Sequence, residues 1–308
     1  MDRVLIFGIA GFVGEYLAKE FQNQGYKVFG SDKVDPGKKL DAVTCCQADL
    51  LNQGEVCEVI CKVKPDIIVN LAAVSSVGYS WDIPQLTIDV NVNGTLNILE
   101  TVRKYYRETK VLLIGSSEEY ASSFEPLKEE SPLDGSSPYG ISKIAQENFS
   151  RLYRERYGLH IYEVRAFNHT GVGQAENFVL PNFCKQVAQI EKSGKEGIIW
   201  VGNLSAYRDF GNVKDIVRAY RMIVEQEKPE LYHVGTGVCH SIKELLEYII
   251  SLSSQKIQVC VDQARVRPVE NPYIRCDYSK IRKELGWEPQ YTIEETLKEL
   301  YEYYLEHD

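Results

Sequence analysis

Short apolar segments and amphipathic segments alternate over the first 167 residues of this chain. The apolar segments are rich in β-branched and aromatic side chains and fit buried strands at 4–7, 26–30, 43–47, 66–71, 110–114 and 159–167. Helical periodicity follows most of them and is clearest in 85–106 and 139–157. Strands that alternate with helices predict an α/β fold, a parallel and doubly wound sheet with right-handed crossovers.

A glycine-rich turn connects the first predicted strand to the first predicted helix. It reads GIAGFVG from Gly8, with the spacing G-x-x-G-x-x-G. Gly8 allows a tight turn, Gly11 lets the backbone approach a pyrophosphate, and Gly14 lets the helix pack on the strand. The helix N-terminus then directs free N–H groups toward the phosphates. The turn, with its Phe12 and Val13, predicts a Rossmann-like dinucleotide site, although a plain strand-to-helix turn is the alternative.

Residues at the ends of the next strands extend this prediction. Asp32 follows the second strand, where a carboxylate accepts both ribose hydroxyls of NAD and repels a 2′-phosphate. NAD is therefore favoured. Because Lys33 weakens that preference, NADP stays possible. Asp49 is a candidate partner for the adenine amino group, or a cap of the following helix. The remaining residues predicted to surround the flat ligand are Leu50, Leu71, Ala72 and Ala73.

Hydroxyl and carboxylate side chains follow the predicted strand 110–114. In an open α/β sheet, ligands bind beyond the carboxyl ends of the strands, so Ser116, Ser117 and Glu118 are placed for chemistry. Ser116 could hydrogen-bond a substrate oxygen and Glu118 could move a proton. Alternatively, the two serines only satisfy amides of the turn. The aperiodic segment 74–84 is predicted to be a loop over the cofactor.

A phenol and an ammonium lie four residues apart in Tyr139 and Lys143. A helix that begins at Pro138, capped by Ser136 or Ser137, places both on one face. The ammonium is expected to lower the tyrosine pKa toward working pH, which makes the phenol a general acid or base. Taken alone, such a pair is more often surface decoration of an amphipathic helix.

The pattern changes after Phe167. Residues 168–174 are loop-like, and the later elements are predicted as helices at 178–189, 213–226, 241–252, 278–285 and 293–305, with short strands at 198–201, 231–234 and 256–261. We predict a dinucleotide-binding domain over 1–167, to which 205–237 returns. A smaller, interleaved substrate-binding lobe is predicted over 168–204 and 238–308.

Composition narrows the class of protein. The formal net charge of −9 argues against a general nucleic-acid binder. No apolar run approaches the roughly 20 residues needed to span a bilayer, and the N-terminus lacks the pattern of a signal peptide. The eight cysteines are scattered without C-x-x-C spacing, which favours reduced cysteines in a cytoplasmic protein and no metal site.

Together, the glycine turn, Ser116 and the Tyr139/Lys143 pair resemble the extended short-chain dehydrogenase/reductase family over nearly the whole chain. The second half resembles its GDP-sugar branch at FNHTGVGQ (167–174), NFV (177–179), VGNL (201–204), RDF (208–210) and the pair Arg267-Pro268. The resemblance implies an NAD(P)-dependent nucleotide-sugar oxidoreductase of deoxysugar biosynthesis. The activity that it implies first is reduction of the C4 ketone of a GDP-4-keto-6-deoxy-hexose.

The resemblance also implies a role for each matching residue. Hydride would pass from the nicotinamide to the carbonyl carbon while Tyr139 protonates the developing alkoxide. Lys143 would hold the nicotinamide ribose, supported by Asn91 through a water or backbone contact, and Ser116 would hydrogen-bond the reacting oxygen. Arg208 would clamp the diphosphate, unless it pairs with a neighbouring carboxylate. The other implied substrate-binding residues are Ser117, Asn168, Asn177, Val179, Lys185, Asn203, Arg267 and Glu270.

Other interpretations stay open. Glu118 matches the base that a GDP-mannose 4,6-dehydratase uses at C5, which a reductase does not need. Another nucleotide-sugar epimerase or reductase is possible, and so is a non-catalytic NAD-sensing protein, although a sensor is expected to lose Tyr139 or Lys143. The family further implies a homodimer with a four-helix interface formed by helices at about 85–106 and 140–157. Neither a nucleic acid nor a membrane is an expected partner.

Overall fold

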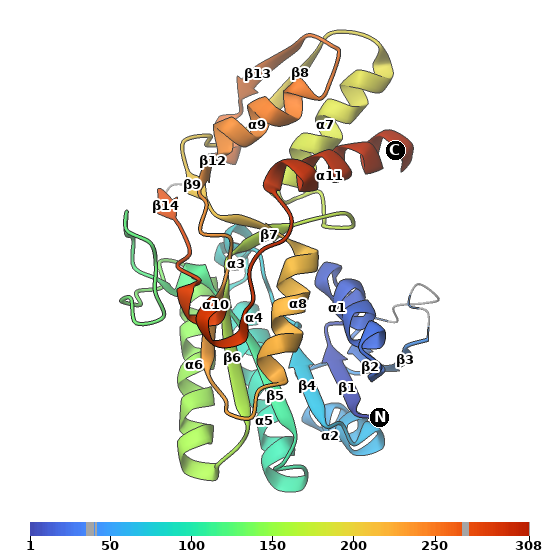
Figure 1. Ribbon diagram of the computed structural model, residues 1–308, viewed down its shortest axis with the longest axis vertical. Coiled ribbons are helices and arrows are strands. Elements are labelled where there is room, and N and C mark those ends of the chain that lie inside the picture. Colours follow the sequence, from blue (N-terminus) through green and yellow to red (C-terminus); the bar gives the residue numbers. More distant parts are fainter. Residues whose placement is uncertain (35–39, 41, 267–270, 308) are drawn as a thin grey trace.

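The computed structural model describes residues 1–34, 40, 42–266 and 271–307 (Figure 1). Arg267 and Glu270 therefore lie outside the described residues. Seven parallel strands form the main sheet, in the order β11-β6-β5-β4-β1-β2-β3. They are β1 (Arg3–Phe7), β2 (Lys27–Asp32), β3 (Thr44–Gln47), β4 (Ile67–Asn70), β5 (Lys110–Ser116), β6 (Ile161–Ala166) and β11 (Leu231–Val234). The predicted doubly wound sheet is confirmed, and its order reverses between β1 and β4, where such sheets bind ligands.

Both faces of this sheet are buried, because alternate side chains of each strand point to opposite sides. Val4 and Ile6 of β1 pack with α1 (Phe12–Asn23) and α8 (Val213–Val224). Leu5 and Phe7 face the other way, toward α2 (Gln53–Val63) and α5 (Gly94–Tyr105). Figure 1 shows these layers in its lower half. The continuous apolar runs of the sequence thus mark strands that are buried on both faces.

The helix that carries Tyr139 and Lys143 begins and ends on clear local signals. In α6 (Pro138–Tyr157), proline occupies the first turn, and the Ser137 hydroxyl accepts the Gly140 N–H at 3.0 Å. Gly158 ends the helix in the left-handed conformation, with a φ of 68°. The predicted helix and its Ser137 cap are therefore confirmed.

The segment before β5 differs from its prediction. The sequence predicts a loop over 74–84, but α3 (Val77–Asp82) forms one short helix there. Ser76 caps this helix, because its hydroxyl accepts the Tyr79 N–H. Then α4 (Pro84–Ile88) continues through a π-helical turn, η2 (Asp89–Asn93), into α5. The single helix predicted over 85–106 therefore contains a π turn.

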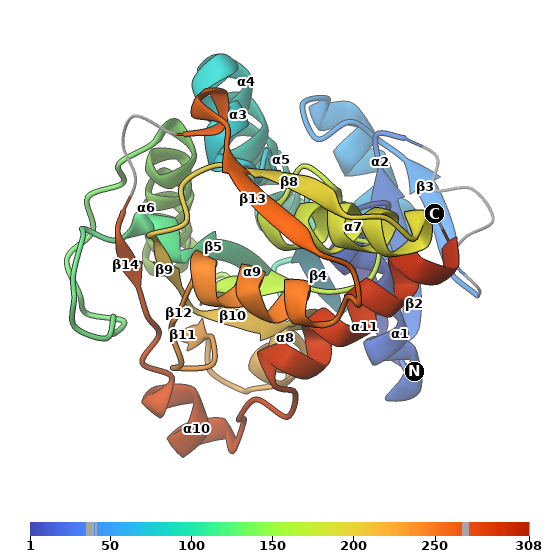
Figure 2. The same ribbon diagram turned by 90° about the horizontal axis from the view of Figure 1, so that it is seen from above.

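A second apolar core lies beyond the carboxyl ends of the strands (Figure 2). Its elements are α7 (Val179–Ser193), β8 (Gly197–Val201), α9 (Ile242–Ser251), β13 (Ile257–Val261) and α11 (Ile293–His307). The range 238–308, which we assign to the smaller lobe, includes one helix that packs on the main sheet instead. This helix is α10 (Ser279–Leu285), which contacts β11 and places Ile281 in the main core.

Short strands connect the two cores. β7 (Asn168–Thr170) pairs with β10 (Phe210–Asn212), so the first residues of the predicted loop 168–174 are a strand. β9 (Tyr207–Arg208) pairs with β12 (His240–Ser241) and β14 (Tyr273–Ile274). The chain thus crosses between the cores several times.

One buried carboxylate joins these crossings. Oδ1 of Asp209 accepts the Thr236 N–H at 2.8 Å and its hydroxyl at 2.7 Å. Oδ2 accepts the N–H groups of Gly237 at 2.8 Å and Cys276 at 3.0 Å. Asp209 is 0% exposed, so these bonds replace the water that it loses.

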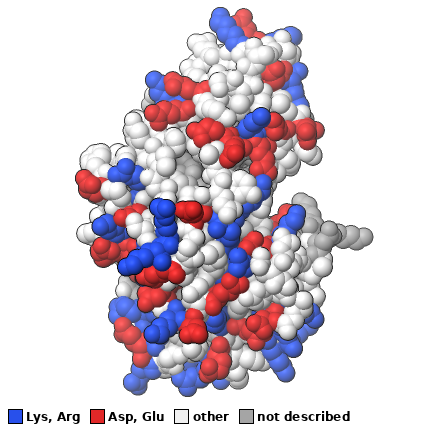
Figure 3. All heavy atoms as spheres, viewed as in Figure 1, with Lys and Arg blue, Asp and Glu red and all other residues white. Residues whose placement is uncertain are grey.

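Acidic and basic side chains are interspersed on the face seen in Figure 3, despite the net charge of −9. In the part of the chain that the structure describes, none of the helices combines the length and apolar character needed to cross a membrane.

Candidate active site

A cavity of about 1070 Å³ lies between the sheet and the second core. This exceeds the roughly 300–1,000 Å³ of most single-ligand pockets, which leaves space for two ligands. Most of the residues that the sequence singles out line it: Gly8, Gly11, Phe12, Val13, Gly14, Asp32, Asp49, Leu50, Leu71, Ala72, Ala73, Ser116, Ser117, Glu118, Tyr139, Lys143, Asn168, Asn177, Val179, Asn203 and Arg208.

The glycine-rich turn fits a dinucleotide. Gly8 has a φ of 82°, and a Cβ there would lie 2.6 Å from the Ala72 nitrogen. α1 begins directly after Gly11, which has no side chain to cap it, so its first N–H groups face the cavity. The buried Ser31 hydroxyl also lines the cavity, and it has no hydrogen-bond partner among the described residues. A pyrophosphate and a ribose would satisfy these groups.

Two carboxylates, Asp32 and Asp49, line the cavity beside the glycine turn and the end of β3. Asp32 accepts the Ala10 N–H at 3.0 Å, so its carboxylate is fixed beside the glycine turn. Asp49 accepts the Leu51 N–H at 3.0 Å. The alternative that Asp49 caps the next helix is wrong, since Asn52 is the N-cap of α2.

Ser116, Tyr139 and Lys143 meet at the carboxyl end of β5. The Ser116 and Tyr139 side chains line the same cavity, and the Ser116 hydroxyl accepts the Glu118 N–H at 3.2 Å. Nζ of Lys143 donates to the Ile114 carbonyl at 2.7 Å and to Oε1 of Gln146 at 3.2 Å, and it lies 5.9 Å from the centre of the tyrosine ring. The ammonium is thus held in place by α6 and β5.

The electrostatics differ from the expectation that Lys143 makes the phenol more acidic. Burial raises the pKa of Tyr139 well above its usual range, opposed by the nearby Ser116 hydroxyl. Burial also lowers the pKa of Lys143 to about 8, which the charge of Glu119 opposes. Desolvation therefore dominates at both groups and favours the protonated phenol.

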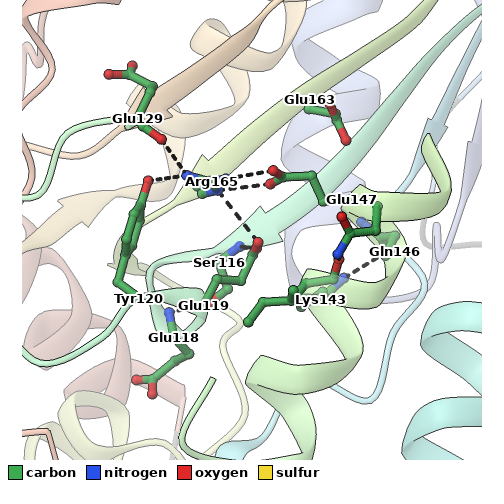
Figure 4. A network of polar contacts seen from close by, with 12 residues as sticks. Ser116, Glu118, Glu119, Tyr120, Glu129, Lys143, Gln146, Glu147, Glu163 and Arg165 are labelled. Atoms are coloured by element: carbon green, nitrogen blue, oxygen red, sulfur yellow. Dashed lines mark hydrogen bonds and ion pairs between the residues drawn. The ribbon is translucent and has the colours of Figure 1, made fainter. Parts of the chain in front are cut away.

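Two neighbouring glutamates take different positions. Glu118 is half-buried, lines the cavity and points away from Lys143 in Figure 4. Glu119 is 0% exposed and turns inward, where its Oε1 accepts the Ser116 N–H at 2.6 Å. The sequence prediction named Glu118 and missed Glu119, because neither residue stands in a periodic segment that would indicate its direction.

Among the described residues, two predicted site residues do not line the cavity. Asn91 accepts the Val74 N–H and donates to the hydroxyl of Ser142, the residue before Lys143, at 2.8 Å each, while Gln146 is the direct side-chain partner of Lys143. Nζ of Lys185 lies 2.7 Å from Oε1 of Glu176 on the outer side of α7. Neither position follows from a motif, since both depend on how helices pack.

Arg208 and Asn168 lie at the far end of the cavity. Arg208 is 8% exposed and donates to the Tyr207 carbonyl at 2.9 Å. Of the two alternative ion-pair partners, Asp209 already accepts the four donors described above, and Glu270 lies outside the described residues. Oδ1 of Asn168 is buried without a hydrogen-bond partner among the described residues. His169 also lines the cavity and stacks on Phe12.

Comparisons with known proteins agree with this geometry. The family model for GDP-mannose 4,6 dehydratase matches residues 5–300. GDP-mannose 4,6 dehydratase 2 of Arabidopsis thaliana is 35% identical, over 96% of this chain and 84% of the relative. GDP-6-deoxy-D-mannose reductase of Pseudomonas aeruginosa is 28% identical, over 96% of this chain and 95% of the relative. The structure of RMD from Pseudomonas aeruginosa complexed with NADPH covers 100% of both chains with a TM-score of 0.87, at 24% identity.

The fold and the cavity define an extended short-chain dehydrogenase/reductase, a class of NAD(P)-dependent enzymes. Its sheet order, glycine turn and Ser-Tyr-Lys site are all present. Within this class, the chain belongs to the GDP-mannose 4,6-dehydratase family. The resemblance found in the sequence is therefore confirmed. The chain is an NAD(P)-dependent enzyme of nucleotide-sugar metabolism.

Proposed function

We propose that the protein reduces the C4 ketone of a GDP-4-keto-6-deoxy-hexose with NADH. The observation that carries this proposal is the meeting of Ser116, Tyr139 and Lys143 inside a cavity that runs from the glycine turn to Arg208, where burial raises the pKa of the Tyr139 phenol. A protonated phenol is the form that donates a proton, as reduction of a ketone requires. Donors placed where the negative oxygen develops stabilise the transition state.

The dinucleotide would be held by the glycine turn and by Asp32. When bound, it supplies the hydride. Gly8 and Gly11 let the backbone approach the pyrophosphate, and the first N–H groups of α1 face its charge. Asp32 would accept the adenosine ribose hydroxyls and disfavour a 2′-phosphate, which supports NADH over NADPH.

The reacting oxygen would lie between Ser116 and Tyr139. Tyr139 gives its proton to the developing alkoxide, and Ser116 hydrogen-bonds the same oxygen. Lys143 keeps a positive charge near the phenol. Its Nζ is held there by the Ile114 carbonyl and the Gln146 side chain. This division of roles uses the three side chains as the structure places them.

The GDP portion would occupy the end of the cavity near the second core. Arg208 would meet the diphosphate, because a guanidinium matches phosphate oxygens in pairs. Asn168 has a buried carbonyl oxygen available for the sugar. Asn177, Val179 and Asn203 would surround the nucleoside.

A second candidate function is the dehydration of GDP-mannose. Glu118 lines the same cavity and could remove a proton from C5, and the Arabidopsis relative with 35% identity is named a dehydratase. The relative named a reductase is 28% identical, over 96% of this chain, so both activities occur among the relatives.

Incubation with two substrates separates these functions. With GDP-4-keto-6-deoxy-D-mannose, the protein is expected to oxidise one NADH for each product molecule, with a higher kcat/KM than with NADPH because Asp32 repels the 2′-phosphate. GDP-mannose alone is expected to stay unchanged. Absorbance of the reduced coenzyme and chromatography of the nucleotide sugars measure both. Conversion of GDP-mannose without NADH oxidation would establish the dehydratase instead.

We also propose that two copies of this chain pair through α4, α5 and α6. Leu86 on α4 is 42% exposed, and Ile141 and Leu152 on α6 are 53% and 48% exposed. α4 packs against α6, so these apolar side chains lie on adjoining helices. Paired helices from two copies would bury them in a four-helix interface.

Sedimentation of a matched pair of variants tests the dimer. Leu152→Glu is expected to raise the dimer dissociation constant at least about tenfold, because it places a charge in the proposed interface. Ile198→Glu on β8 is the control, since Ile198 is also 48% exposed but lies on the second core. A wild-type protein that sediments only as a monomer contradicts the proposal.

A further inference from the structure

A buried arginine lies directly behind the Ser-Tyr-Lys site. Arg165 on β6 is 3% exposed. Its Nε and Nη2 donate to the two carboxylate oxygens of Glu147 on α6, at 2.9 Å and 2.6 Å (Figure 4). Nε also lies 3.5 Å from Oε2 of Glu119. One planar guanidinium thus fixes a strand, the helix α6 and the turn after β5 relative to one another.

Each of these two carboxylates lies close in the structure to a proposed catalytic residue. Glu119 accepts the backbone N–H of Ser116 and so determines where the serine lies. Glu147 stands one helical turn after Lys143 on the same helix. The cluster therefore controls the distance between the serine on β5 and the lysine on α6.

The backbone has little freedom to compensate if the cluster is lost. A Cβ at Gly115 would lie 2.5 Å from Oε1 of Glu119, and one at Gly140 would lie 2.4 Å from the carbonyl oxygen of Glu118. The first turn of α6 thus packs directly on the turn that carries Ser116. A small shift of either element would move the serine and the phenol apart.

The same guanidinium also holds the loop that leads into α6. Nη1 of Arg165 donates to the Tyr120 hydroxyl and, at 2.8 Å, to the Glu129 carbonyl. The Tyr120 hydroxyl in turn contacts Nε2 of His233 on β11. Every donor nitrogen of Arg165 therefore has a partner on an element that surrounds the site.

Several titratable groups surround Glu119. The charged ones are Glu147, Arg165 and Lys143, and the phenols that face it are Tyr139 and Tyr120. Burial, followed by the charge of Glu147, raises the pKa of Glu119 to about 8, and Arg165 opposes this shift. The negative charge of Glu119 raises the pKa of Lys143 against the opposite effect of burial.

We propose that Arg165 is a positioning residue, which holds Ser116 through Glu119 and the catalytic helix through Glu147. The proposal rests on the catalytic roles given above for Ser116, Tyr139 and Lys143. Arg165 and Glu119 act only through those residues and touch neither substrate nor coenzyme. The cluster also sets the charge around Lys143.

Glu119→Gln tests this with the least change in shape, because its Oε1 can still accept the Ser116 N–H. We expect kcat to fall about tenfold, while KM for the nucleotide sugar and the dissociation constant for NADH change less than about twofold. The wild-type Glu119 gains its negative charge near pH 8, the range in which Lys143 titrates. Without that charge the pKa of Lys143 is expected to fall below about 8, so activity is lost at lower pH on the alkaline side.

Glu163→Gln is the matched control. Glu163 on β6 is 4% exposed and pairs with Arg154 on α6, so it joins the same two elements farther from the site. The control is expected to keep the kcat and pH profile of the wild type. Arg165→Lys is expected to recover part of the activity that Arg165→Met loses. Equal effects of Glu163→Gln and Glu119→Gln would reduce the cluster to a stabilising role and overturn the proposal.

A measurement without substrate separates this proposal from the function itself. The Cε resonance of ¹³C-labelled Lys143, assigned with Lys143→Arg, reports its titration in the ligand-free protein. We expect the midpoint in Glu119→Gln to lie below that of the wild type, and an unchanged midpoint overturns the inference. If Glu119→Gln does not fold, the kcat values of Arg165→Lys and Arg165→Met carry the test, and equal losses in both overturn the inference. A wild type that turns over neither nucleotide sugar refutes the proposed function alone.

Discussion

Replacement of Tyr139 by phenylalanine is expected to lower kcat by about a thousandfold, within the range that a positioned general acid contributes. The variant keeps the ring, which is 8% exposed, and removes only the hydroxyl that meets Ser116. Binding of NADH should therefore change little, because the glycine turn and Asp32 are untouched. Steady-state NADH oxidation and fluorescence titration of the coenzyme measure the two properties.

Tyr153→Phe provides the control for this prediction. Tyr153 lies on the same helix, and its hydroxyl donates to Glu100 at 2.7 Å on the side away from the cavity. Its loss is expected to leave kcat within about twofold of the wild type. A Tyr139→Phe variant that retained its turnover would remove the proton donor from the proposed mechanism.

Gly14→Ala is expected to lower the free energy of unfolding by about 3 kcal/mol, the cost of a clash that the core cannot relieve. A Cβ at Gly14 would lie 2.2 Å from the Ile9 carbonyl oxygen and 2.7 Å from its carbon. These are backbone atoms of the glycine turn, so they cannot rotate away. Any relief must displace the turn, and NADH binding should weaken as well.

The control for Gly14→Ala is Gly54→Ala, also in the first turn of a helix. There the nearest atom to an added Cβ is Oδ1 of Asn52 at 3.3 Å. The expected change in unfolding free energy is within about 0.5 kcal/mol. The urea midpoints of both variants measure the difference, and equal midpoints would show that close helix–strand packing at Gly14 is not required.

The sheet and the dinucleotide turn could be predicted because their signals are local. A buried parallel strand is a short apolar run, and the spacing of Gly8, Gly11 and Gly14 states where the backbone must come close to a ligand. The helix α3 could not be predicted, because its six residues include Gly78 and are too few to show a helical period. The π turn at 89–93 likewise leaves the apolar pattern of the surrounding helix intact.

Side-chain partners at the site depend on contacts that are distant in sequence. Asn91 bonds Ser142, which is 51 residues away and directly precedes Lys143. Glu119 could not be distinguished from Glu118, because only the packing of Arg165 from β6 decides which of the two carboxylates turns inward. The motifs thus identify the reacting side chains, while the groups that hold them require the folded chain.

The carboxylate of Asp209 has a thermodynamic consequence for ligand affinity. Because it fastens Thr236, Gly237 and Cys276 at one point, the two walls of the cleft are already in register before anything enters. Binding of a nucleotide sugar then costs little free energy for ordering the protein, so a larger part of the interaction energy contributes to affinity.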